Sequence, residues 1–218
     1  GTGICGSGII EVVAEMYLAG VVSTDGVVDG ALEGQTSRIK KDGRTWSYVL
    51  HEADNPDTSD IVITQTDVRQ IQLAKAALYA GIRLLMDEMG VTTVDRIRLA
   101  GAFGSHISVS HAMVLGLIPD CDLEQVTSAG NAAGAGARMA LLDRNARLEI
   151  ANTIAKAERI ETALADDFQA HFVGAMGLPH QSDAFPNLFS SVTPPVAKSL
   201  ESGDTPKRRR RRTARPNA

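Results

Sequence analysis

Three glycine-rich segments have the residue types and spacing that could bind a ligand. They are residues 1–8 (GTGICGSG), 101–104 (GAFG) and 129–137 (AGNAAGAGA). Glycine and alanine let a backbone approach a ligand or a helix closely, and helix N-termini favour anions. The spacing fits neither the P-loop pattern G-x-x-x-x-G-K-[ST] nor the dinucleotide pattern G-x-G-x-x-G after a strand. Those two nucleotide sites are therefore set aside.

The second segment stands in a strand, turn and helix arrangement. Residues 96–100 (RIRLA) predict a strand, the turn 101–104 follows at once, and a helix is predicted through 109–115. Open α/β sheets bind ligands beyond the carboxyl ends of their strands. We therefore predict a ligand site at this turn. His106 follows the turn and could reach a ligand, although packing is the commoner role of a lone histidine.

The other side chains with chemical potential are scattered along the chain. Cys5 and Cys121 are the only cysteines, so the chain cannot supply a disulfide framework or a four-thiolate iron–sulfur or zinc site. We expect Cys5 to be packed and inert, and Cys121 to be more exposed. The histidines show no metal-ligand spacing, and His111, His171 and His180 are predicted to be surface or capping residues. No metal site is predicted.

The elements that would position these segments predict an α/β domain. Low aromatic content, 4% of residues, requires a core of aliphatic and small side chains. Ile61, Val62 and Ile63 predict a short buried strand, and Asp42-Gly43 predicts the turn of a β-hairpin. The predicted elements are a helix over 9–18, hairpin strands over 37–41 and 44–51, helices over 66–89, 129–142, 147–158 and 167–176, and a possible strand over 159–163.

The helix over 66–89 has the clearest pattern in the sequence. Thr64 and Asp67 resemble a capping box at its start, and Gly90 ends it. Apolar residues repeat at spacings of three and four, which predicts the buried face: Ile71, Ala74, Leu78, Ile82, Leu85 and Met89. The opposite, wetter face is predicted to carry Arg69, Gln72, Arg83 and Asp87.

The charge is distributed unevenly along the chain. The net charge is −4, yet residues 207–218 hold seven basic residues and no acid, so residues 1–206 form a strongly acidic globule. A nucleic-acid-binding fold would carry positive charge on a folded face, so such a fold is not predicted. No apolar stretch approaches the ~20 residues that span a bilayer, and no signal pattern opens the chain. We expect a soluble cytoplasmic protein without membrane partners.

Five motifs, taken in order, closely resemble the C-terminal domain of the reductive activators of corrinoid proteins. The resemblance covers residues 1 to about 180. The motifs are GICGSGII at 3–10, TQTDVR at 64–69 with QLAK at 72–75, LAGAFG at 99–104, GNAAGAGA at 130–137 and FVGAMGLPH at 172–180.

The resemblance implies a ribonuclease-H-like fold of the superfamily that includes actin, the acetate and sugar kinases and the heat-shock chaperones (ASKHA). In this family ATP, expected with Mg²⁺, binds between two ribonuclease-H-like halves, and an N-terminal ferredoxin domain carries a two-iron two-sulfur cluster. The implied function is ATP-dependent electron transfer to an inactive Co(II) corrinoid on a methyltransferase partner, which restores Co(I).

The resemblance also assigns residues to roles. Those similar to the adenosine motif are Gly101, Ala102, Phe103 and Gly104. Those similar to the second connecting helix, at the hinge between the halves, are Gly130, Asn131, Ala133 and Gly134. Gly6, Ser7 and Gly8 resemble the nucleotide-binding loop of the related dehydratase activators, with a shorter spacing. No catalytic residue is assigned.

The family's phosphate-binding Asp-x-Gly strand and its cluster cysteines are missing from this sequence. Because the chain also opens inside a glycine loop without methionine, we expect it to be the C-terminal part of a longer polypeptide, supplying the adenosine wall and the hinge. Two alternatives are a non-catalytic partner-docking module and a small-molecule kinase of the same fold. For a kinase we identify no catalytic carboxylate beside a substrate pocket.

The last 38 residues, 181–218, are rich in Ser, Pro and Asn and contain the arginine run 208–212. This composition predicts a disordered tail, because it offers little apolar surface to bury. The run could contact nucleic acid, a membrane surface or an acidic protein surface by charge alone, and we assign it no function.

Overall fold

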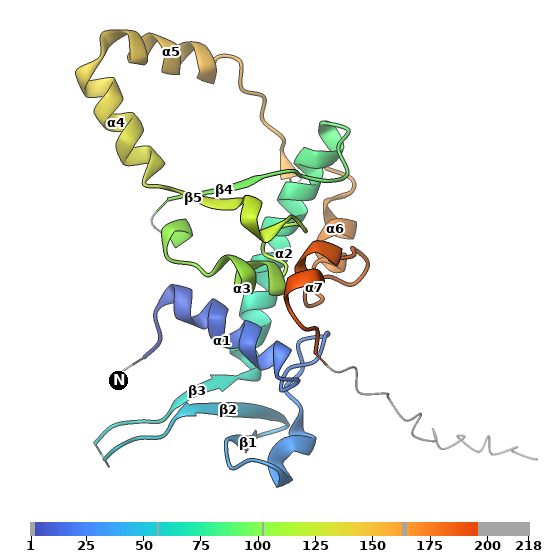
Figure 1. The fold of residues 1–218 in the computed structure, drawn as a ribbon. Helices are drawn as coiled ribbons and strands as arrows, with labels where there is room; N and C mark the ends of the chain where they lie inside the picture. The colour runs from blue at the N-terminus through green and yellow to red at the C-terminus, as the bar shows by residue number, and fades with distance from the viewer. Residues whose placement is uncertain (1–2, 56, 102, 163–164, 196–218) are drawn as a thin grey trace, which may run out of the picture.

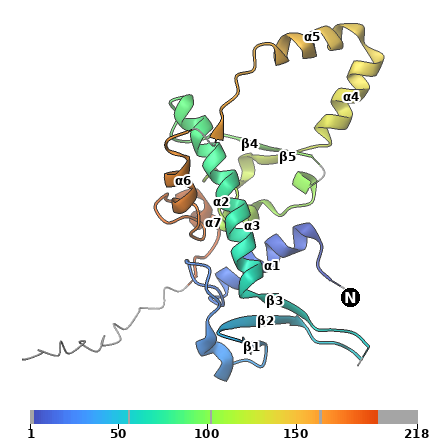
Figure 2. The same ribbon diagram turned by 180° about the vertical axis from the view of Figure 1, so that it is seen from behind.

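The computed structural model describes residues 3–55, 57–101, 103–162 and 165–195. They form a mixed α/β structure along one long helix, α2 (Gln65–Glu88), with most of the other elements beside it or at its ends (Figure 1, Figure 2). No helix of the described residues is long and apolar enough to cross a membrane.

The strands form two separate small sheets. The first is antiparallel with strand order β1-β2-β3, and the second is a parallel pair, β4-β5. The strands are β1 (Ile39–Asp42), β2 (Thr45–His51), β3 (Ile61–Thr64), β4 (Ile97–Ala100) and β5 (Val126–Gly130). The predicted hairpin is confirmed, with Asp42 opposite Thr45 across the turn. The predicted strands before residues 64 and 101 are also confirmed.

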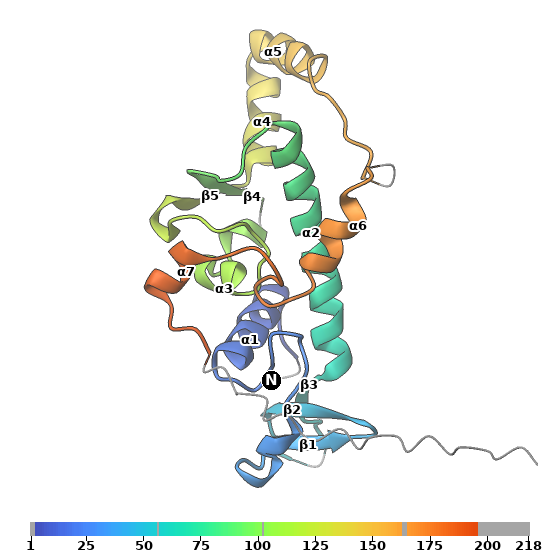
Figure 3. The same cartoon turned by 90° about the vertical axis from the view of Figure 1, so that its right-hand side faces the viewer.

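Seven helices are present in the described residues, and most of them surround α2. Figure 3 shows α1, α3 and α7 on one side of α2, α6 against it, and α4 with α5 extending from one end of the molecule. Besides α2, the helices are α1 (Gly6–Leu18), α3 (Val109–Val114), α4 (Ala132–Leu142), α5 (Arg144–Ile154), α6 (Phe168–Gly174) and α7 (Pro186–Ser191). Single 3₁₀ turns are η1 (Gly30–Gly34), η2 (Phe103–Ser105) and η3 (Leu123–Gln125).

The start of α2 is as predicted, but its buried face is not. The capping box between Thr64 and Asp67 is present, with both reciprocal hydrogen bonds made. Gln72, predicted to face water, is only 1% exposed, whereas Leu85, predicted to be buried, is 54% exposed. The prediction of the buried face was therefore wrong. Polar contacts with a segment a hundred residues away decide which side of α2 is covered.

Gln72 and Lys75 make those contacts from the buried side of α2. The Gln72 side-chain amide donates to the carbonyls of Met176, at 2.7 Å, and of Asp25, at 3.1 Å. The Lys75 ammonium donates to the carbonyl oxygens of Gly177 and Pro179, the latter at 2.6 Å. Burial lowers the pKa of Lys75 to about 7, because the charged form loses its water.

Tyr79 and His180 extend this buried polar face by one helical turn. The Tyr79 hydroxyl donates to the Asp183 carboxylate at 2.7 Å, and its ring lies 4.8 Å from the His180 ring, centre to centre. His180 was predicted to be a surface or capping residue, but its side chain is buried. Its Nδ1 accepts from the backbone amides of Ser182 and Asp183. α2 therefore holds the segment that follows α6 by side chains on three successive turns.

The chain remains ordered beyond His180, contrary to the predicted boundary. Residues 181–195 are described, and they include α7, whose Leu188 is fully buried in the core together with Phe185. The Asp120 carboxylate accepts hydrogen bonds from the amides of Asn187 and Leu188, which fixes the start of α7. Residues 196–218, with the arginine run, lie outside the described residues, so the prediction of disorder there stays a prediction.

Two segments differ in type from the predicted elements. The glycine-rich run that begins at residue 129 was predicted to be helical throughout, but its first two residues complete β5, and α4 begins only at Ala132. The possible strand over 159–163 is not formed by residues 159–162, the part of it that the structure describes. The small residues of the first segment fit a strand because β5 pairs along β4.

Candidate functional site

The predicted ligand turn follows directly on β4. Gly101 has φ of +107°, a conformation that L side chains rarely adopt. A Cβ on Gly104 would lie 3.0 Å from the Cβ of Leu99, so the turn folds back tightly onto its own strand. Phe103 begins the 3₁₀ turn η2 and is 52% exposed, and Ala102 lies outside the described residues. The turn therefore presents an aromatic face on a closely packed backbone.

The hinge segment lies beside this turn. Since β4 and β5 are parallel, their carboxyl ends meet at one edge of the sheet, and the Gly101 amide donates to the Gly130 carbonyl at 2.8 Å. Asn131 is the N-cap of α4, and its Oδ1 accepts from the amide of Gly134 at 2.9 Å. Ala133 and Gly134 lie in the first turn of α4. The structure thus brings two of the three glycine-rich segments together.

The opening segment reaches the same place from the other end of the chain. α1 begins at Gly6, where a Cβ would lie 3.7 Å from Cε2 of the Phe103 ring. Ser7 and Gly8 lie in the first turn of α1, and the Gly8 amide donates to the Cys5 sulfur at 3.4 Å. The first turn of a helix has amide groups without helical acceptors, which attract anions. The glycine-rich segments at residues 6, 101 and 130 therefore meet at one site.

The two cysteines exchange the positions predicted for them. Cys5, predicted to be packed, is exposed and caps α1, and Cys121, predicted to be exposed, is buried. The Ser7 hydroxyl, with the Gly8 amide, holds the pKa of the Cys5 thiol below its ordinary value, while burial raises that of Cys121. Cys5 is the N-cap of α1, with an extended backbone before the helix and its sulfur accepting from the Gly8 amide.

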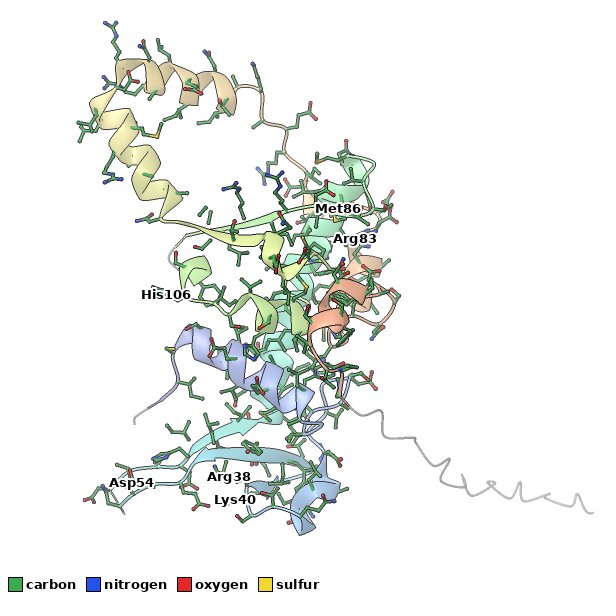
Figure 4. All side chains as sticks on the ribbon, in the orientation of Figure 1. Arg38, Lys40, Asp54, Arg83, Met86 and His106 are labelled. Atoms are coloured by element: carbon green, nitrogen blue, oxygen red, sulfur yellow. The ribbon has the colours of Figure 1, made fainter. Side chains whose placement is uncertain are left out.

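His106 lies at the outer edge of the site. Figure 4 shows it beside the η2 turn, above the N-terminal end of α1, and it is exposed. The other two histidines predicted at the surface are partly buried and paired with acids: His111 with Glu15 at 2.7 Å and His171 with Asp87 at 2.8 Å.

Within the described part of the chain, no three His, Cys, Asp or Glu side chains are grouped so that they could hold a metal ion.

Two serines contribute to the site that the sequence analysis did not identify. The Ser105 hydroxyl donates to the Gly101 carbonyl at 3.0 Å, and the Ser128 hydroxyl donates to that of Ser105 at 3.3 Å. Isolated serines near glycine turns are common, and only the parallel pairing of β4 with β5 brings these two into contact. No local sequence signal could have identified them.

Two apolar cavities lie elsewhere on the molecule. One runs along the exposed side of α2 beside Ile160, and its lining includes Leu78 and Leu85. The other lies between α4 and α5, where its lining includes Met139 and Ile154. Both are lined mainly by aliphatic side chains, whereas the glycine site offers backbone amides, hydroxyls and one aromatic ring. The glycine site therefore remains the candidate for binding a polar ligand.

The class of protein is defined by this fold and site together with a family comparison. Residues 1–189 match the family model described as the C-terminal domain of RACo, the ASKHA domain. The chain belongs to this family, and the predicted ribonuclease-H-like fold class is confirmed.

Two characterised proteins are similar to the chain. The corrinoid activation enzyme RamQ of Eubacterium limosum is 36% identical over 150 residues, which are 65% of this chain and 25% of RamQ. The solved structure of a reductive activator for corrinoid, iron–sulfur protein superposes with a TM-score of 0.71 at 33% identity, covering 81% of this chain and 28% of that one. The chain therefore spans about a quarter of the length of these relatives.

Proposed function

We propose that this chain is the adenosine-binding and hinge part of an ATP-dependent reductive activator of corrinoid proteins. The observation that carries the proposal is the meeting of the segments at Gly6, Gly101 and Gly130 at the carboxyl edge of a parallel strand pair. The names of both similar proteins refer to corrinoid activation or to a corrinoid activator.

The residues present fit the nucleoside part of ATP. The exposed Phe103 ring offers a flat apolar face for adenine, and Gly6 leaves the space beside that ring open. Gly101 and Gly104 allow the backbone to approach the sugar closely. The amide groups of Gly6 and Ser7, at the start of α1, favour the negative phosphates. In the proposal these residues bind and orient the nucleoside.

The residues present do not fit the other groups that the family implies. A four-cysteine iron–sulfur cluster cannot be assembled from Cys5 and Cys121, and the described residues offer no group of acidic side chains for Mg²⁺. The proposal assigns both groups to the part of the relatives that this chain does not cover.

The contact between the turn and the hinge would let nucleotide binding affect the position of α4. The turn that would hold adenosine is hydrogen-bonded to Gly130, directly before the Asn131 cap of α4. A change in the turn on ATP binding would therefore act on α4 first. The partner is a corrinoid protein or methyltransferase, whose Co(II) takes up one electron from a low-potential reductant and becomes Co(I).

The first test is binding of ATP by the full-length gene product, with Gly101→Val as the variant. Valine at φ of +107° is strained by about 1–3 kcal/mol, so the turn of the free variant should relax to another conformation. Because ATP binding would have to restore the strained turn, we expect ATP affinity to fall about tenfold or more. Gly43→Val is the matched control, because Gly43 also has positive φ, +59°, but lies in the β1–β2 turn away from the site. Equal ATP affinity of Gly101→Val and the unaltered protein would contradict the assigned site.

The same preparation distinguishes the alternative functions. We expect Co(I) to form from a Co(II) corrinoid protein in the presence of reductant and ATP, followed by absorbance, and formation to slow in Gly101→Val. If the unaltered protein binds no ATP, the partner-docking function remains, for which the exposed apolar residues of α4 and α5 would be the surface. Transfer of phosphate to a sugar or carboxylic acid would instead favour the kinase.

A further inference from the structure

Four hydrogen bonds form a closed ring at the edge where β4 and β5 end. The Gly101 amide donates to the Gly130 carbonyl at 2.8 Å, and the Gly130 amide donates to the Ser128 hydroxyl at 3.1 Å. The Ser128 hydroxyl donates to the Ser105 hydroxyl at 3.3 Å, which donates to the Gly101 carbonyl at 3.0 Å. Each hydroxyl therefore donates once and accepts once, and all donors point the same way round the ring.

The ring depends on two irregularities at the end of β5. The register between β4 and β5 shifts after Leu99, so that Ala100 pairs with Gly130 instead of the residue before it. Gly130 has φ of +63°, which turns its amide back toward Ser128 in its own strand. Because of these two features, the backbone groups of Gly130 leave the regular hydrogen-bonding pattern of the sheet. They bond instead to the Gly101 amide and the Ser128 hydroxyl, as members of the ring.

We propose that Ser105 and Ser128 are positioning residues for the nucleotide, and that the ring they close transmits nucleotide binding from the turn at Gly101 to α4. This inference rests on the proposed function. The ring holds the turn at its start, through the Gly101 carbonyl, and at its end, through Ser105. It joins the hinge at Gly130, next to the Asn131 cap.

Because the ring is exposed, its hydrogen bonds should contribute more to nucleotide affinity than to the stability of the free protein. Ser105 and Ser128 are exposed, so water competes for their hydrogen bonds in the free protein. A nucleoside that covers the turn excludes this water, and hydrogen bonds strengthen when the local dielectric constant falls. Bonds aligned in one direction also polarise one another. The ring should therefore contribute more in the nucleotide complex than in the free protein.

Ser128→Ala opens the ring without removing any backbone group, and it is tested in the full-length gene product. We expect ATP affinity to fall about three- to tenfold, because the variant loses the two hydrogen bonds of this hydroxyl, each of which is weakened by competing water. The thermal unfolding midpoint of the free protein should not change, because Ser128 is exposed. Ser128→Thr, which keeps the hydroxyl, should restore the affinity. Thr127→Val is the matched control, since Thr127 is the exposed neighbour that points to the other face of β5.

Amide hydrogen exchange tests the transmission to α4. In the unaltered protein, ATP should slow exchange in the first turn of α4, residues 132–135, and this protection should be lost in Ser128→Ala at saturating ATP. Unchanged ATP affinity in Ser128→Ala, or no recovery of affinity in Ser128→Thr, would overturn the positioning role. If residues 132–135 of Ser128→Ala were protected by ATP as strongly as in the unaltered protein, the transmission to α4 would be overturned. Absence of ATP binding in the unaltered protein would instead refute the proposed function itself.

Discussion

Replacing the buried Lys75 should change how the free energy of unfolding depends on pH. Its side chain is fully buried, and its ammonium donates to the carbonyl oxygens of Gly177 and Pro179. Burial lowers its pKa from 10.5 to about 7. Lys75→Met keeps most of the length of the side chain and removes the titrating group, so the comparison isolates the effect of the proton.

The pH dependence follows from linkage between protonation and folding. Between pH 7 and 10.5 the unfolded chain holds a proton on Lys75 that the folded protein does not, so the free energy of unfolding rises with pH. The slope is about 1.4 kcal/mol per pH unit, and the whole shift corresponds to about 5 kcal/mol. Below pH 7 both states are protonated and the contribution is constant. Lys75→Met lacks this slope.

The measurement is urea unfolding of both proteins at about pH 7.5 and about pH 9.5, followed by far-ultraviolet circular dichroism. All other titrating groups are common to the two proteins, so their effects cancel in the difference. We expect the free energy of unfolding of the unaltered protein, relative to Lys75→Met, to rise by about 2–3 kcal/mol over this interval. A difference that stays constant or falls would show that Lys75 remains charged in the folded state and would refute the reasoning.

Two further pairs of substitutions test the packing around α2. Gly116→Ala should lower the free energy of unfolding by at least about 2 kcal/mol, because its Cβ would collide with the Pro179 carbonyl, whereas Gly20→Ala, with nearly the same φ and free space, should cost about 1 kcal/mol. Equal costs would mean that the close approach at Gly116 does not exist. Leu84→Ala should cost about 2–5 kcal/mol and Leu85→Ala about 0.5 kcal/mol or less, since only Leu84 is buried. If thermal unfolding showed the larger destabilisation for Leu85→Ala, the buried face of α2 would be the one that the periodicity predicted.

The difference at α2 shows where periodicity stops being informative. The spacing of Ile71, Leu78 and Leu85 correctly predicted a helix, because local periodicity and the Thr64 cap act within a few residues. Which face is buried depends on what packs against it. Here Gln72, Lys75 and Tyr79 bind the segment after α6, and part of the apolar stripe is left exposed. Long polar side chains can be buried in this way once carbonyl groups satisfy them.

For the candidate site too, the sequence indicated the segments, but only the tertiary structure showed that they meet. The glycine segments at 1–8, 101–104 and 129–137 were recognisable in the sequence, since their composition requires a close backbone approach. Their meeting was not recognisable from spacing alone, because it needs the parallel pairing of β4 with β5 and the contact of Gly6 with Phe103. The hydroxyl ring of Ser105 and Ser128 depends on the same pairing.

The sequence by itself determined the elements and the family: the hairpin, the cap of α2, the strand before Gly101 and the order of five motifs. These features depend on interactions within a few residues or on the order of residues, and both are written in the chain. Only the tertiary structure decided that Cys121 is buried, that Cys5 is exposed and that residues beyond His180 are ordered. Burial is a property of surfaces that meet across large sequence distances, and Leu188 is buried because distant parts of the chain supply its neighbours.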